Sequence, residues 1–109
     1  MPITGENLRL AVLSMILSDE PGIYREGMHG VRHENLVLVR RLGDNEFGSW
    51  LGFEPLTLCH FDTSCLDVSL LSADEIEWLN AYNRRVYEVL SPRLPAEVAQ
   101  WLKAKTRPV

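Results

Sequence analysis

The sequence lacks the cysteine pattern of a zinc site or a disulfide framework. Its 109 residues contain only two cysteines, Cys59 and Cys65, and neither has a companion histidine or cysteine at zinc-ligand spacing. Cysteines outside such patterns behave as small, mostly buried apolar residues. We therefore expect two free, buried thiols in a cytoplasmic protein.

The sequence also lacks an excess of positive charge and a long apolar run. The net charge is −4 at pH 7, and the basic residues are scattered along the chain. A nucleic-acid-binding domain would need clustered Lys and Arg, so neither nucleic acid nor an acidic membrane surface is expected as a partner. The most apolar N-terminal stretch, Leu8 to Leu17, contains Arg9 and is too short to span a bilayer. We interpret it as part of the fold rather than as a signal peptide.

What remains has the composition of an ordinary globular domain, with 46% hydrophobic and 24% charged residues. The length predicts a single domain over residues 1–109. Within it we expect an irregular lead-in over 1–14, a strand-rich part over 15–68 and a helical tail over 69–109. The predicted fold class is α+β, with a curved antiparallel sheet followed by two C-terminal helices.

Two strands are predicted around a glycine-rich turn. Met15 to Ser18 is the first, and Pro21-Gly22 ends it because Pro21 cannot donate to a sheet ladder. The second, Val31 to Arg40, alternates so that Arg32 and Glu34 share one face with two leucines, Leu36 and Leu38, which we expect to point inward. A charged pair beside buried leucines needs a partner, a metal or water, so this face is a candidate site.

Residues 42–49 are polar, contain two glycines and predict the turn of a hairpin. The following stretch, Trp50 to Phe61, predicts either one long strand or two short strands interrupted at Glu54-Pro55. Both alternatives fit an antiparallel meander.

The last third of the chain changes to helical periodicity. Ser72-Ala73-Asp74-Glu75 is a capping box that predicts a helix start, and Ser91-Pro92 predicts its end. Pro95 suits the first turn of a second helix. The apolar stripes expected to pack comprise Ile76, Leu79, Tyr82, Val86 and Leu90 on the first helix, and Val98, Trp101 and Leu102 on the second. Trp78 is also expected in the helix-packing core.

Several motifs occur in an order that resembles one known family. They are Leu17-Ser-Asp-Glu-Pro-Gly-Ile-Tyr24, Gly30-Val-Arg-His-Glu-Asn-Leu-Val-Leu-Val39, Phe53-Glu-Pro-Leu-Thr-Leu58, Leu66-Asp-Val-Ser-Leu-Leu71, Glu75-x-x-Trp-Leu-Asn80 and Trp101-Leu102. From about Met15 to the end, the chain resembles the C-terminal end of Xaa-Pro aminopeptidases (aminopeptidase P), which are dinuclear metallopeptidases of the pita-bread fold.

The resemblance implies roles for particular residues. Glu20, in the EPG motif, would bind one metal ion and help to transfer protons, and Glu34, in the R-x-E-N motif, would bridge two ions. Arg32 would support the carboxylates, and His29, in the nearby turn, is a candidate substrate contact. The family uses two divalent ions (Mn, Zn or Co) and removes the N-terminal residue of peptides with proline in second position. The implied class is therefore a metalloaminopeptidase, a hydrolase.

The chain also departs from the family pattern. The family's other ligands, two aspartates and a histidine, precede the EPG motif and have no counterpart here, and Ser14 and His60 replace a usual Gly and Pro. With two of five ligands, we expect no tightly bound metal and no activity from this chain alone. Three interpretations stay open: an inactive C-terminal fragment, a separate subunit that completes a site with a partner chain, and a non-enzymatic interaction module. Unpaired strand edges also predict a homodimer.

Overall fold

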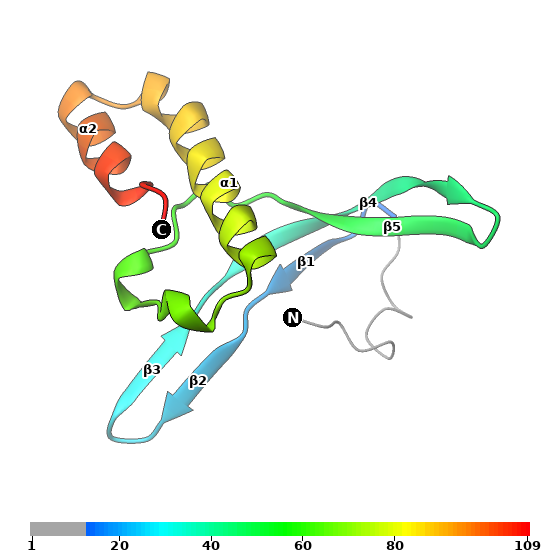
Figure 1. Ribbon diagram of the computed structural model, residues 1–109, viewed down its shortest axis with the longest axis horizontal. Coiled ribbons are helices and arrows are strands. Elements are labelled where there is room, and N and C mark those ends of the chain that lie inside the picture. The colour runs from blue at the N-terminus through cyan, green and yellow to red at the C-terminus, as the bar shows by residue number, and fades with distance from the viewer. Residues whose placement is uncertain (1–12) are drawn as a thin grey trace. The chain divides into compact units, whose positions relative to one another are not determined.

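The computed structural model describes residues 13–109, which form two compact units. The first ends at Thr57 and contains all of the strands, and the second, Leu58–Val109, contains both α-helices (Figure 1). The order of strands first and helices after confirms the predicted α+β class. The boundary at Thr57 falls inside the part predicted to be strand-rich, and the lead-in predicted over 1–14 lies almost wholly outside the described residues.

The first unit contains two antiparallel sheets. One has three strands in the order β1 (Ile16–Asp19), β4 (Asn35–Asn45) and β5 (Gly48–Pro55). The other pairs β2 (Gly22–Arg25) with β3 (His29–Arg32). The strand predicted over Val31–Arg40 is therefore divided: its first two residues belong to β3, His33 and Glu34 lie between the strands, and β4 begins at Asn35.

The hairpin between β4 and β5 is longer and its loop tighter than the sequence predicts. Asn45 pairs with Gly48, which leaves a two-residue loop of Glu46 and Phe47 in place of the polar turn predicted over 42–49. The backbone of this polar stretch pairs across the hairpin despite the lack of apolar alternation, with a register shift between Arg41 and Gly43. The strand ends at Pro55, so the prediction that strand structure continues to Phe61 was wrong.

The second unit contains the two predicted helices, α1 (Ala73–Leu90) and α2 (Ala96–Lys105). Short 3-10 turns precede α1 at Thr63–Cys65 and Val68–Leu70, and another joins the helices at Ser91–Arg93. The capping box is present: the Glu75 backbone N–H donates to Ser72 Oγ at 3.3 Å, and Glu75 Oε2 accepts from the Ser72 N–H at 2.8 Å. The N-cap prediction is confirmed.

The core of the second unit lies between the two helices and the segment that precedes them. Its buried members are Tyr82, Val86 and Leu102, with Leu58, Phe61, Tyr87, Leu90 and Leu94 packed against them. Two predicted core aromatics, Trp78 and Trp101, are instead about half exposed. Trp78 stacks on Tyr82 with ring centroids 5.4 Å apart, so it covers the edge of the core rather than filling it.

On β4 the buried row is opposite to the one predicted. Asn35 and Val39 are buried, whereas Leu36 is 44% exposed. Alternation alone defines two faces and cannot say which of them is covered. The side chain of Asn35 can be buried because both of its polar atoms are hydrogen-bonded.

Among residues 13–109, neither α-helix combines the length and the apolar character needed to cross a membrane.

Candidate metal centre

Glu20 and Glu34 lie at the junction between the two sheets of the first unit. The β1–β4 ladder ends with Asp19 opposite Asn35, and the β2–β3 ladder begins with Gly22 opposite Arg32. Between them the backbone N–H of His33 donates to the carbonyl of Pro21 at 3.2 Å. The register therefore continues unchanged across the junction, and it places Glu20 opposite Glu34.

The sequence explains why the ladder breaks here. Pro21 has no backbone N–H and cannot complete a pair of ladder bonds with His33. Gly22 then restarts the pairing where the chains approach closely, because a Cβ at this position would lie 2.9 Å from the Tyr24 ring and 3.1 Å from the Val31 carbonyl oxygen. The break releases Glu20 and Glu34 from regular strand geometry while the ladders on both sides hold their backbones.

Arg32 connects the two carboxylates. Its Nη1 lies 2.5 Å from Glu20 Oε2, and its Nε lies 3.8 Å from Glu34 Oε2. The hydroxyl of Ser18 donates to the other oxygen of Glu20, Oε1, at 2.8 Å. Like charges placed opposite each other on paired strands repel. The guanidinium of Arg32 therefore offsets the repulsion between the carboxylates of Glu20 and Glu34. The structure thus brings together Glu20, Arg32 and Glu34, as the motifs predict.

The donor set suits part of a metal site. Carboxylate oxygens are hard ligands of the kind that Mn²⁺ accepts, and the two side chains converge on one positive group while staying about half exposed. Within residues 13–109, however, no group of three or more His, Cys, Asp or Glu side chains is arranged to hold a metal ion. The described residues therefore offer two carboxylate donors at this place, fewer than a complete metal centre requires.

His29 is not part of this group. It begins β3 and pairs with Arg25 at the turn end of the β2–β3 ladder. It lies five positions before Glu34 in the sequence, which corresponds to roughly 16 Å along an extended strand. Its role as a substrate contact stays a prediction.

Ser18 and Asn35 were not singled out from the sequence, although signals for both were available. Ser18 lies two residues before Glu20, a spacing that puts both side chains on one strand face. Asn35 directly follows Glu34 and falls in the apolar row of β4, where a buried amide requires partners. Its partner, Thr57, lies 22 residues further along the chain and could not be found from local pattern.

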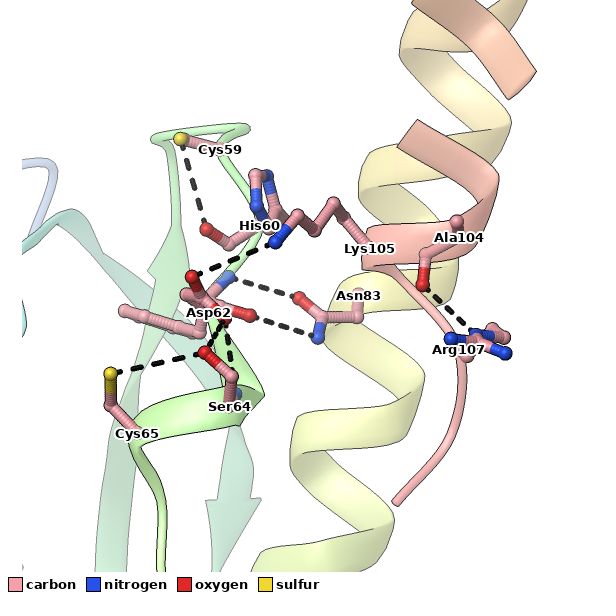
Figure 2. Close-up of polar contacts among 10 residues, drawn as sticks. Cys59, His60, Asp62, Ser64, Cys65, Asn83, Ala104, Lys105 and Arg107 are labelled. Carbon is pink, nitrogen blue, oxygen red and sulfur yellow. Dashed lines mark hydrogen bonds and ion pairs between the residues drawn. The ribbon is translucent and has the colours of Figure 1, made fainter. Parts of the chain in front are cut away.

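The second unit has its own polar cluster, shown in Figure 2, around the segment before α1. Asp62 accepts from the backbone N–H and the hydroxyl of Ser64, and these bonds, the hydroxyl first, hold the pKa of the Asp62 carboxyl below its usual value. Lys105 Nζ lies 3.9 Å from Asp62 Oδ2. Asn83 bonds to both backbone groups of Phe61. These contacts fasten the segment to the two helices and indicate a structural role.

Both cysteines are free, as predicted, but they are exposed rather than buried. Cys59 lies in the irregular segment that follows β5, and Cys65 ends a 3-10 turn, so neither belongs to a strand or helix face that packs. The expectation of buried thiols was wrong because it rested on residue type alone.

Comparison with known proteins agrees with this description. The chain is 40% identical over 100 residues to a probable Xaa-Pro aminopeptidase P of Coprinopsis cinerea, and 46% identical over 99 residues to aminopeptidase P2 of Arabidopsis thaliana. Each match covers 87% of this chain. The chain spans only 16% and 14% of the length of these two relatives.

A solved structure is also similar: the X-prolyl aminopeptidase of Caenorhabditis elegans, described as a cytosolic enzyme with a di-nuclear active site. It superimposes with a TM-score of 0.80 at 33% identity, over 91% of this chain and 17% of the C. elegans chain. This match supports the predicted likeness to the C-terminal part of the pita-bread fold. Residues 49–109 match the family model described as the C-terminal region of peptidase_M24, and the chain belongs to that family.

Proposed function

We propose that this chain supplies two carboxylate ligands, Glu20 and Glu34, to the dinuclear centre of an Xaa-Pro aminopeptidase. The observation that carries the proposal is the uninterrupted register, which sets the two carboxylates opposite each other with Arg32 between them. The relatives named as aminopeptidases and the di-nuclear site of the C. elegans enzyme support it. The substrate would be a peptide with proline in second position.

Each residue has a distinct task in this proposal. Two divalent ions, for which we infer manganese, would supply positive charge and would lower the pKa of a bound water. Glu34 would serve as a ligand to both ions. Glu20 would serve as a ligand to one of them and would take up and return a proton during the reaction. Arg32 holds the carboxylates in orientation through its contacts with both Oε2 atoms. The two aspartates and the histidine that the family adds would come from polypeptide outside this sequence.

A chimaeric enzyme tests the proposal. Residues 13–109 would replace the matching segment of the C. elegans X-prolyl aminopeptidase, and cleavage of an Xaa-Pro peptide with Mn²⁺ would be measured. We expect activity that Glu20→Ala or Glu34→Ala abolishes. Glu46→Ala, in the exposed β4–β5 loop, should leave it unchanged. An active chimaera that tolerates Glu34→Ala would refute the proposal.

The chain alone, without the rest of the enzyme, should show no cleavage of the same peptide above background and should lose Mn²⁺ on desalting.

A second possibility, a separate subunit or interaction module, is favoured by the apolar surface of the first unit. The exposed side chains include Ile16, Ile23, Tyr24, Val31, Leu36, Leu42, Phe47 and Trp50. The strands β1 and β5 lie at the edges of their sheet, where unpaired backbone groups favour association. We infer a homodimer of a cytoplasmic protein. Size-exclusion chromatography with light scattering should give twice the chain mass, and a monomer at micromolar concentration would contradict it.

A further inference from the structure

Asn35 directly follows Glu34 and is one of the few buried polar residues in residues 13–109. Its side chain bonds to both backbone groups of Thr57: Oδ1 accepts from the Thr57 N–H at 3.1 Å, and Nδ2 donates to the Thr57 carbonyl at 3.5 Å. One amide side chain thus satisfies the donor and the acceptor of a single residue 22 positions away.

These bonds extend the β4–β5 pairing past the point where the backbone ladder stops. The ladder ends at Val37 opposite Pro55. Beyond it the Leu56 N–H donates to the Leu36 carbonyl at 2.7 Å, and the Leu36 N–H donates to Thr57 Oγ1 at 3.0 Å. The first two residues of β4 are therefore held on the β5 side largely by the side chains of Asn35 and Thr57.

On its other side, the start of β4 pairs with β1. Asp19 lies opposite Asn35 in the last position of that ladder, and the next position holds Glu20 and Glu34. Asn35 is therefore fixed from both sides at the residue adjoining the carboxylate pair. Movement of its backbone would carry Glu34 with it.

We propose that Asn35, through its paired bonds to Thr57, is a positioning residue that sets the placement of Glu34 and hence the affinity of the carboxylate pair for a divalent cation. This inference rests on the proposed function, because it concerns the same site. Residues that hydrogen-bond directly to a metal ligand typically change metal affinity by about 10- to 100-fold when they are removed. The bonds of Asn35 to Thr57 act on Glu34 through the backbone, so we expect an effect at the lower end of this range.

The chain provides a matched control in Asn83. Its side chain makes the same two bonds to one backbone, accepting from the Phe61 N–H at 3.2 Å and donating to the Phe61 carbonyl at 3.5 Å. Asn83 is also buried, at 1% exposure, but it belongs to the second unit and adjoins no proposed ligand. Asn35→Ala and Asn83→Ala should therefore lower the stability of the chain by similar amounts. Only Asn35→Ala should lower the affinity of the carboxylate pair for a divalent cation.

The experiment is a Mn²⁺ titration of the ¹⁵N-labelled chain, followed by paramagnetic broadening of the Glu20 and Arg32 amide signals. We expect Glu34→Ala to weaken binding strongly, Asn35→Ala to raise the Kd about tenfold, and Asn83→Ala to change it less than about twofold. Thr57→Val removes the acceptor of the Leu36 N–H while keeping the backbone that Asn35 binds. It should raise the Kd by a smaller factor and serves as the test if Asn35→Ala does not fold.

The outcomes separate the two proposals. If Glu34→Ala binds Mn²⁺ as the wild type does, the proposed function fails, and this inference fails with it. If Glu34→Ala weakens binding but Asn35→Ala and Thr57→Val do not, only the role of Asn35 is refuted. An equal loss of affinity in Asn83→Ala would also refute it, because the effect would then reflect general destabilisation.

Discussion

Replacing Arg32 with methionine should loosen the junction between the two sheets of the first unit. The guanidinium contacts both carboxylates, at 2.5 Å from Glu20 Oε2 and 3.8 Å from Glu34 Oε2. Methionine has a similar length without the charge, so the variant would leave two carboxylates opposite each other with no cation between them. Opening of the junction would then become easier.

The size of the effect follows from the exposure of the three side chains, which are 44% to 53% exposed. An ion pair at this exposure contributes about 0.5–1 kcal/mol, well below its Coulomb energy in a dry interior. Two carboxylates about 5 Å apart in water repel by about 0.8 kcal/mol, and this repulsion is unmasked in the variant. The total of about 1.5 kcal/mol corresponds to roughly tenfold more frequent opening.

Amide hydrogen exchange of His33 measures this opening directly, because its N–H bonds to Pro21 across the junction. We expect roughly tenfold faster exchange in Arg32→Met at low ionic strength, and a much smaller change in 1 M salt, where the Debye length is about 3 Å.

A second ion pair provides the control for this measurement. Arg40 Nη1 lies 2.5 Å from Glu54 Oε2 in the β4–β5 hairpin. Arg40→Met should therefore leave His33 exchange unchanged. Unchanged exchange in Arg32→Met would refute the bridging role of the guanidinium, and acceleration that persists in 1 M salt would refute its electrostatic origin.

Three further predictions concern the second unit. Ser72→Ala removes the N-cap of α1 and should lower the free energy of unfolding by about 1 kcal/mol, measured by urea denaturation followed at 222 nm. The bonds from the Ser72 backbone and hydroxyl hold the pKa of Glu75 below its usual value. Their stabilisation is therefore complete above the pKa of an unfolded glutamate and is lost as the pH falls through the lowered folded-state pKa. Acid titration of the melting temperature should show this loss in the wild type and a flatter profile in Ser72→Ala. Asn83→Ala leaves both backbone groups of Phe61 without their side-chain partner and should cost about 2 kcal/mol in the same denaturation assay.

Features that depend on neighbouring residues could be predicted from the sequence. The capping box at Ser72 needs only a side chain and an amide three residues apart, and Ser91-Pro92 marks the end of α1 by the same local logic. The grouping of Glu20 with Glu34 is local as well, since one short hairpin connects them. Their role as ligands remains a prediction.

Features that depend on residues far apart in the sequence could not be predicted in this way. Leu36 and Leu38 suggested the wrong inward face for β4, because the partner that allows Asn35 to be buried, Thr57, lies beyond the next strand. The polar residues Asp44 and Asn45 carry no strand signal of their own, and they are extended because Ser49 and Gly48 pair with them. In each case the contact that determines the structure crosses the β4–β5 hairpin, and the residue pattern does not specify the loop length of that hairpin.

The shared register of the two ladders also constrains how this hairpin can change length during evolution. Removing one residue from β2 and its partner from β3, such as Tyr24 together with Gly30, would shorten the arm and keep Glu20 facing Glu34. A deletion in only one arm would turn one glutamate to the other side of the ribbon. Homologues with shorter or longer arms should therefore differ by equal numbers of residues before and after the turn.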